Sequence, residues 1–318
     1  MQTSRRSILK GSILASLAGT MGATAMSASA AEKQAALPKK EYDLVICGLG
    51  IGGIVTAIRA AQDGLKPVIL EKMSSAPGNT IYSAGFMLGV NTKMQQEKKL
   101  ETGDTVDKFY EDMMKVSQGR GDPKLTRLVA EKADETLNWL HDYVGVKYAV
   151  GMKLVWPMLQ RAHLTIGEKK PGGTQLMLYL LAKAKELNVP IVYNAKAVEL
   201  LDNPQNGKVI GVKVKSKEGF EEYFGKYGVV MATGGFSANK MMLTMMAGVP
   251  AANMPVRGSH SVTGESILLT GPYFPKVVNV DQYHCGPIHG PTGANPLNIV
   301  NTCLLYTSPS PRDTRSSR

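Results

Sequence analysis

The chain has 318 residues, with 37 Lys and Arg against 26 Asp and Glu, five His and three Cys. This length can bury a sizeable core, and 43% apolar with only 20% charged residues excludes a disordered chain. Three Cys are too few for a disulfide scaffold, and the net charge of +11 raises the question of a polyanionic partner.

Residues 1–30 have the pattern of an export signal, in which basic residues precede a mildly apolar stretch and a small-residue cleavage site. Residues 4–10 read SRRSILK and resemble a twin-arginine signal, with Ile8 at the usual Phe position. A membrane anchor is the alternative, but it needs about 20 apolar residues and this stretch is shorter. We expect export to a bacterial periplasm by the twin-arginine route, no stable membrane anchor, and a linker over residues 31–40.

The end of the chain, residues 303–318, resembles the translation of a sequencing-library adapter, although a polar disordered tail would have a similar composition. We expect a non-native tail here and a natural sequence that is cut off near residue 302. The signal carries +3 of the net charge and the tail +2, which leaves +6 for residues 31–302. These residues contain no long basic run and few aromatic residues, so we expect no nucleic-acid partner.

A strand, a glycine-rich turn and a helix are predicted in succession after the linker. The apolar run 42–47 is short enough for a buried parallel strand, residues 48–53 read GLGIGG, and the Ala-rich stretch 51–63 has a helical pattern. A lone G-x-G-x-x-G is weak evidence in a Gly-rich chain. Between a strand and a helix it is typical of a dinucleotide-binding site.

Each part of this motif has a physical role. Gly48 allows the tight turn, Gly50 lets the backbone approach a pyrophosphate, and Gly53 lets the helix pack closely on the strand. The helix N-terminus offers N–H groups and a partial positive charge to the phosphates. Glu71 ends the next apolar run, 67–71, where it can accept hydrogen bonds from a ribose diol or be an ordinary solvated acid.

The elements that follow are helices and a small antiparallel meander. Helices are predicted over 104–116 and 124–143 because Leu residues recur on their faces. Short β-type runs at 197–201, 208–215 and 221–224 are separated by turn residues and predict the meander. A Met cluster between residues 241 and 246 is interpreted as adaptable core.

Three further segments resemble the fumarate reductase/succinate dehydrogenase flavoprotein family. Residues 78–85, GNTIYSAG, are similar to its G-G-N-[ST]-x-x-[SA]-x-G-G stretch, and residues 230–236, VMATGGF, to its strand ending in A-T-G-G-F. Residues 263–266, TGES, resemble its T-G-D-G with Glu for Asp and Ser for Gly. The resemblance extends from about residue 42 to 302, and soluble exported fumarate and urocanate reductases look most similar.

This resemblance implies an α/β fold, in which a Rossmann-like FAD-binding domain has a parallel sheet and a small antiparallel β-meander. It places that domain over residues 41–284 and the start of a truncated capping domain over 285–302. It also implies that Val198 faces the adenine through its backbone, although the glycine pair that begins at Gly234 would suit a simple strand-ending turn as well. The motif and the resemblance together predict a set of FAD-binding residues. They are Gly48, Gly50, Gly53, Glu71, Lys72, Asn79, Thr80, Ser83, Gly85, Val198, Thr233, Gly234, Thr263, Gly264 and Glu265.

The segment 281–287 is similar to the family's Q-x-H-P stretch, whose His holds a substrate carboxylate. Gln282 and His284 match it, while Cys285 replaces the Pro. A zinc site formed by His284, Cys285 and His289 is a weak alternative because no second ligand pair follows, so we expect no metal. Cys47, in the first apolar run, is interpreted as inert core.

The family implies reduction of the C=C bond of an unsaturated carboxylate by hydride from flavin N5. The proton donor would lie in the part of the capping domain that this sequence does not include. No C-x-x-C-H motif is present to attach haem, so a separate redox partner such as a cytochrome c would supply electrons. A 3-ketosteroid dehydrogenase-type flavoprotein and a non-catalytic FAD-binding fragment remain as alternatives.

Overall fold

A computed structural model describes residues 37–281, apart from 76–77, 101–102, 153–155, 157–159, 169–170 and 257. The predicted export signal, Gln282, His284, the predicted start of the capping domain and the predicted tail all lie outside the described residues.

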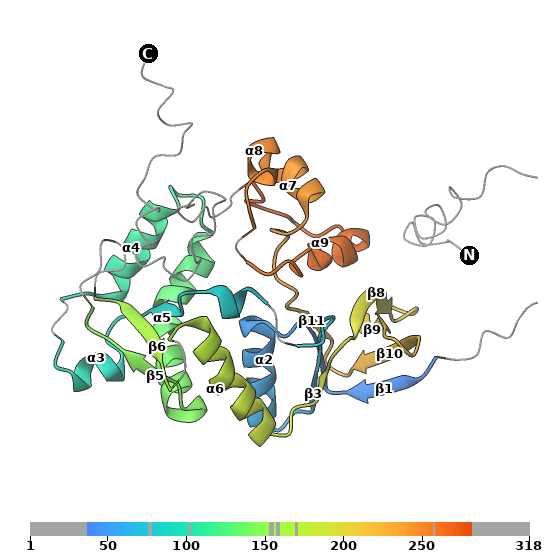
Figure 1. Cartoon of the computed structure of the whole chain (residues 1–318), viewed down its shortest axis with the longest axis horizontal. Coiled ribbons are helices and arrows are strands. Elements are labelled where there is room, and N and C mark those ends of the chain that lie inside the picture. Colours follow the sequence, from blue (N-terminus) through green and yellow to red (C-terminus); the bar gives the residue numbers. More distant parts are fainter. Residues whose placement is uncertain are drawn as a thin grey trace, which may run out of the picture.

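A four-stranded parallel sheet forms the centre of the fold (Figure 1). Its strand order is β11-β2-β3-β7, and the predicted strands after the linker and before Glu71 lie side by side within it. The short apolar runs form strands because both faces of the sheet are covered, which favours uninterrupted β-branched and aliphatic residues. The strands are β2 (Leu44–Cys47), β3 (Pro67–Leu70), β7 (Ile191–Val192) and β11 (Val229–Met231).

Alternate side chains of β2 and β3 enter two different cores. Ile46 and Ile69 pack with apolar residues of α2 (Ile51–Gln62) and α6 (Gly173–Glu186). Val45 and its neighbours of the other parity pack with the meander instead. Because successive side chains of a strand point to opposite faces, helices cover one face and the meander covers the other.

The meander is an antiparallel sheet that β1 extends in parallel with β10. Three of its strands confirm the predicted antiparallel runs, and β1 begins at Lys39, inside the predicted linker. The strands are β1 (Lys39–Tyr42), β8 (Lys196–Asp202), β9 (Val209–Lys215) and β10 (Phe220–Gly225).

A third sheet, which the sequence did not predict, has the order β4-β6-β5 and is antiparallel. It packs with the predicted helices, the second of which ends in a π-helical turn at Leu140–Val144. The elements are β4 (Phe86–Leu88), α3 (Lys93–Glu97), α4 (Val106–Val116), α5 (Pro123–Trp139), β5 (Lys147–Ala149) and β6 (Ala162–Ile166).

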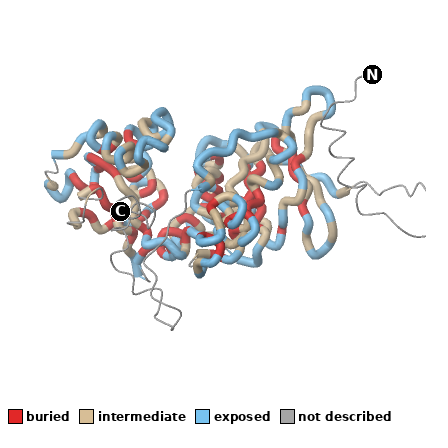
Figure 2. The backbone as a smooth tube through the Cα atoms, turned by 90° about the horizontal axis from the view of Figure 1, so that it is seen from above, coloured by how far each residue is buried: buried red, intermediate tan, exposed pale blue. Residues whose placement is uncertain are grey.

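The last described part contains short helices near the end of β11 (Figure 1). Buried residues lie mainly in the interior of the fold and exposed residues on its outside (Figure 2). The first core cluster joins residues of β2 and β3 to residues of α2 and α6. Within the part of the chain that the structure describes, no helix is long and apolar enough to span a bilayer. The remaining helices are η1 (Asn79–Tyr82), α7 (Lys240–Ala247), α8 (Val249–Ala252), α9 (Glu265–Thr270) and η3 (Gly271–Tyr273).

Candidate functional site

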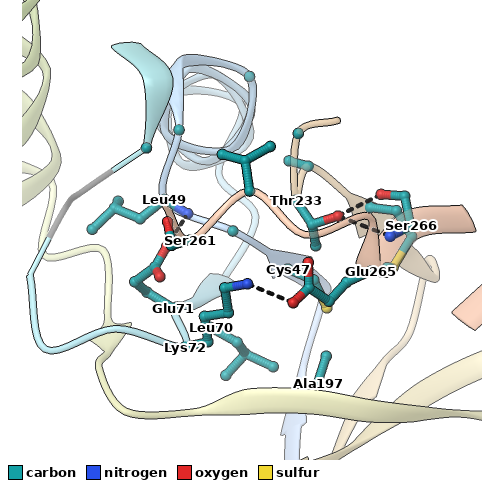
Figure 3. Close-up of a pocket in the computed structure, with 18 of the residues that line it drawn as sticks. Cys47, Leu49, Leu70, Glu71, Lys72, Ala197, Thr233, Ser261, Glu265 and Ser266 are labelled. Carbon is teal, nitrogen blue, oxygen red and sulfur yellow. Dashed lines mark hydrogen bonds and ion pairs between the residues drawn. The ribbon is translucent and has the colours of Figure 1, made fainter. Parts of the chain in front are cut away.

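A cavity of about 460 Å³ lies at the carboxyl ends of β2, β3 and β11 (Figure 3). Segments that are far apart in the sequence line it, including the first turn of α2, the start of β8 and the start of α9. Ligands of open α/β sheets bind in this position, outside the carboxyl ends of the strands. The predicted residues that line it are Gly48, Gly50, Glu71, Lys72, Asn79, Thr80, Thr233, Gly234 and Glu265.

The glycines of the turn after β2 have different roles. Gly48 has φ +109°, and a Cβ there would lie 2.5 Å from the carbonyl oxygen of Ala232. A Cβ at Gly53 would lie 2.0 Å from the carbonyl oxygen of Gly48, so only glycine allows the helix to pack this closely. Both positions therefore serve the protein's own packing.

Gly50 is different, because neither its backbone nor its protein neighbours require a glycine. Its φ of −82° and ψ of 180° suit any residue. Among the described residues, the nearest protein atom to an added Cβ is the Oγ1 of Thr80, at 3.9 Å. An added Cβ would enter the cavity instead, which is the space that a pyrophosphate against the first turn of α2 needs. The residues present therefore fit a dinucleotide.

Glu71 is buried, and both of its carboxylate oxygens face the wall of the cavity (Figure 3). Oε2 accepts the N–H of Leu49 at 2.9 Å and Oε1 accepts the N–H of Met73 at 2.9 Å. Each carboxylate oxygen has two acceptor positions, so both can accept a second hydrogen bond. The carboxylate is thus held in one orientation with acceptor capacity left for a ribose diol.

Side chains of η1 hold two other segments of the cavity wall in place through hydrogen bonds. The Oγ1 of Thr80 accepts the N–H of Ile51 at 2.9 Å, at the start of α2. The Oδ1 of Asn79 accepts the N–H of Ser259 at 2.8 Å, which brings the segment before α9 to the cavity. In the structure, these two side chains organise the site through its backbone as well as lining it.

Lys72 and Glu265 line one side of the cavity (Figure 3) and form a hydrogen-bonded group with Thr263, which lies beside the cavity. The Nζ of Lys72 lies 2.5 Å from the Oε1 of Glu265 and donates to the Oγ1 of Thr263 at 3.0 Å. Thr263 in turn donates to the Oε1 of Glu265 at 2.6 Å. Burial acts to raise the pKa of Glu265, but the hydrogen bonds from Lys72 and Thr263 outweigh it and lower that pKa below its usual value.

Thr233 connects the end of β11 to α9. Its Oγ1 accepts the N–H of Ser266 at 3.0 Å and lies 2.6 Å from the Oγ of that residue. Gly264, which precedes the helix, has φ +89°, and its N–H donates to the carbonyl oxygen of Gly235 at 3.0 Å. The Ser in place of the family's second glycine therefore has a partner within the site.

Some predicted residues lie beside the cavity and do not line it. Ser83 and Gly85 contact the start of α6, since Ser83 accepts the N–H of Gly173 and a Cβ at Gly85 would lie 2.3 Å from the Cα of Gly172. At the start of β8, Ala195, Lys196 and Ala197 line the cavity, whereas Val198 does not. The predicted residues outside the lining are Gly53, Ser83, Gly85, Val198, Thr263 and Gly264.

Sequence reasoning missed several lining residues. Ser261 belongs to no recognised motif, Ser266 was noted only as a departure from the T-G-D-G motif, and Leu49 takes part through its backbone N–H. Cys47 also lines the cavity, and burial raises the pKa of its thiol to about 12. Among the described residues, no group of three or more His, Cys, Asp or Glu side chains could hold a metal ion.

A cavity at this sheet edge, with a glycine-rich helix N-terminus and a buried acid, defines a dinucleotide-binding protein with a Rossmann-like fold. A family profile described as FAD binding domain matches residues 43–270. This is more than half of the chain, so the chain belongs to this FAD-binding family. The predicted fold class and the predicted cofactor, FAD, are confirmed.

Individual relatives are reductases. A urocanate reductase of Eggerthella lenta is 32% identical over 64% of this chain and 33% of its own length. An acrylate reductase flavoprotein subunit of Shewanella woodyi is 30% identical over 85% of this chain and 54% of its own. A solved flavocytochrome c3 fumarate reductase in an open conformation has a TM-score of 0.68 and 25% identity, covering 85% of this chain and 43% of that one. The chain thus spans between a third and about half of these proteins.

Proposed function

We propose that this chain is the FAD-binding part of an oxidoreductase that reduces the C=C bond of an unsaturated carboxylate of the fumarate or urocanate type. The observation that carries the proposal is the space in front of Gly50, which no described protein atom fills and no backbone constraint explains. Membership of the FAD-binding family identifies the group that would take this space.

The cavity wall gives the cofactor a direction. The pyrophosphate would lie against Gly50 and the start of α2, where N–H groups of the first helical turn face an anion. The adenosine would lie between Glu71 and the start of β8, because Glu71 would accept hydrogen bonds from the ribose hydroxyls. Bound FAD would supply hydride from its flavin ring, and the chain's own residues would hold and orient it.

The substrate class rests on the relatives and on residues outside the described part. Relatives named for urocanate, acrylate and fumarate reduction share the acceptor chemistry of a double bond conjugated to a carboxylate. We assign His284 and Gln282 to that carboxylate, which a protonated imidazole and an amide can bind. Export through the twin-arginine route and electron supply by a separate redox protein such as a cytochrome c complete the proposal.

A reconstitution experiment tests this function. The full chain is purified and incubated with FAD, and free flavin is removed by gel filtration. The bound flavin is then photoreduced without oxygen and mixed with fumarate, urocanate or acrylate. We expect about one FAD per chain. We expect recovery of the oxidised flavin absorbance with at least one of these enoates only from a longer form of the protein that includes the capping domain with the proton donor, and not from the 318-residue chain.

Other outcomes distinguish the alternatives. FAD retention without reoxidation by any enoate, in the longer form that includes the capping domain, would favour a non-catalytic FAD-binding protein. Bleaching of the oxidised flavin by a saturated 3-ketosteroid, without enoate reduction, would favour a ketosteroid dehydrogenase. Failure to retain FAD would contradict the proposal at its first step.

A further inference from the structure

The first half of α5 exposes three apolar side chains on one face. Leu125, Leu128 and Val129 are 63%, 52% and 54% exposed. Their spacing of i, i+3 and i+4 makes them neighbours on the surface of a helix. The opposite face of α5 is covered, because Ala130 packs with Phe109 of α4 in a small core. The three exposed side chains therefore form a continuous apolar patch, which we call the α5 patch.

The second half of the same helix has the surface that water normally meets. Lys132 and Glu135 are exposed and form an ion pair with each other at 2.7 Å. A surface helix carries charged and polar residues of this kind on the side away from its core. Single exposed apolar residues are common, but a continuous apolar patch indicates a surface that binds something.

The end of the described chain returns to the start of α5. Arg120, in the turn before this helix, donates to the Oδ1 of Asp281 at 2.7 Å and to its Oδ2 at 3.0 Å. The backbone carbonyl of Arg120 also accepts a hydrogen bond from the Nδ2 of Asn279 at 3.0 Å. Leu125 follows Arg120 by five residues, so their Cα atoms lie within about 18 Å of each other. The chain therefore continues from a point close to the α5 patch.

The composition of residues 282–302 suits an apolar surface. This segment contains no Asp, Glu, Lys or Arg, and residues 297–300 read LNIV. Segments that remain in solvent are typically rich in charge, so an uncharged segment with aliphatic residues gains free energy from burial. Fully extended, it could span about 70 Å, so its aliphatic residues can reach the α5 patch from Asp281.

We propose that the α5 patch is the docking surface for residues 282–302 of this chain, with the aliphatic side chains of 297–300 covering the three apolar residues of α5. The ion pair between Arg120 and Asp281 fixes where the segment begins, and burial of apolar area on α5 holds it in place. The inference goes beyond the proposed function and does not depend on bound FAD.

Hydrogen exchange of the full chain, measured by mass spectrometry on peptides from residues 282–302, tests this inference. The patch variant is Leu125→Ala/Leu128→Ala/Val129→Ala, because alanine removes apolar area and is a strong helix former. The matched control is Met241→Ala/Met245→Ala on α7, where both methionines are more exposed than any residue of the α5 patch. Peptides from α5 and thermal unfolding measure any loss of helix or fold in each variant.

We expect peptides from 282–302 in the parent chain to exchange at least about tenfold more slowly than an unstructured chain. In the patch variant this protection should fall at least about fivefold, while exchange within α5 stays the same. The control on α7 should keep the protection of the parent chain. So should Leu304→Ala/Leu305→Ala, which removes apolar residues of the predicted tail.

Exchange of residues 282–302 at the rate of an unstructured chain would overturn the inference. Protection that is unchanged in the patch variant would overturn it as well. Protection that is lost in Leu304→Ala/Leu305→Ala would assign the α5 patch to the tail instead. Protection that rises with protein concentration, together with dimers in analytical ultracentrifugation, would assign the patch to a second copy of the chain and would also contradict the proposal.

Discussion

Replacing Gly50 by alanine tests whether the space in front of this residue serves a ligand or the packing of the protein itself. The backbone at this position suits alanine, and the new methyl would meet no atom of the described residues closer than the Oγ1 of Thr80 at 3.9 Å. Alanine reduces the backbone conformational entropy of the unfolded chain, so the free energy of unfolding should rise by about 0.4–1 kcal/mol. The same methyl projects into the cavity at the pyrophosphate position, so FAD affinity should fall at least about tenfold, or ~1.4 kcal/mol.

Gly53→Ala is the matched control, because its methyl would lie 2.0 Å from the carbonyl oxygen of Gly48. Overpacking of this kind costs about 1–3 kcal/mol of stability, occasionally more. The assay is urea unfolding of both variants without ligand, followed by flavin titration. If Gly50→Ala binds FAD as tightly as the parent chain, or unfolds as readily as Gly53→Ala, the assignment of this space to the cofactor is wrong.

Three further predictions concern residues with unusual burial. Arg161 is 2% exposed and forms ion pairs with two carboxylates, so Arg161→Met should lower the free energy of unfolding by about 3–5 kcal/mol. As a control, Lys132→Met removes an exposed ion pair and should leave the urea midpoint unchanged. Burial lowers the pKa of His163, so the unfolded state binds more protons and stability should fall as pH drops below about 6.5. Urea unfolding at pH 5 and 7.5 should show that the free energy of unfolding falls less between these pH values in His163→Gln than in the parent chain. An equal fall in both proteins would contradict the prediction. With its pKa raised to about 12, Cys47 should resist iodoacetamide at pH 8 and react after unfolding in guanidinium, as peptide mapping would show.

The sequence predicted the parts of the fold that local patterns determine. The glycine-rich turn, its flanking strand and helix, and the meander all have short-range signals, and the structure brings Gly48 and Glu71 to one cavity as expected. The sheet formed by β4, β5 and β6 was missed. Its strands are three to five residues long, and β4 pairs with β6 across more than 70 residues of sequence, so neither periodicity nor spacing reveals it.

Side-chain contacts within the site were also beyond prediction. The contact of Asn79 with Ser259 and the pairing of Lys72 with Glu265 each join residues about 180 or more positions apart. At the start of β8, a bulge between Ala197 and Glu199 shifts the register, and Ala197 lines the cavity where Val198 was expected. The prediction concerned the backbone of Val198, and a bulge is a local irregularity of the backbone that a pattern of residue types does not record.

A crystal structure of the full chain with FAD tests the central claim most directly. The account predicts the adenosine between Glu71 and the start of β8 and the pyrophosphate in front of Gly50. FAD bound elsewhere, or a cavity at Gly50 that stays filled by solvent while FAD is bound, would contradict it.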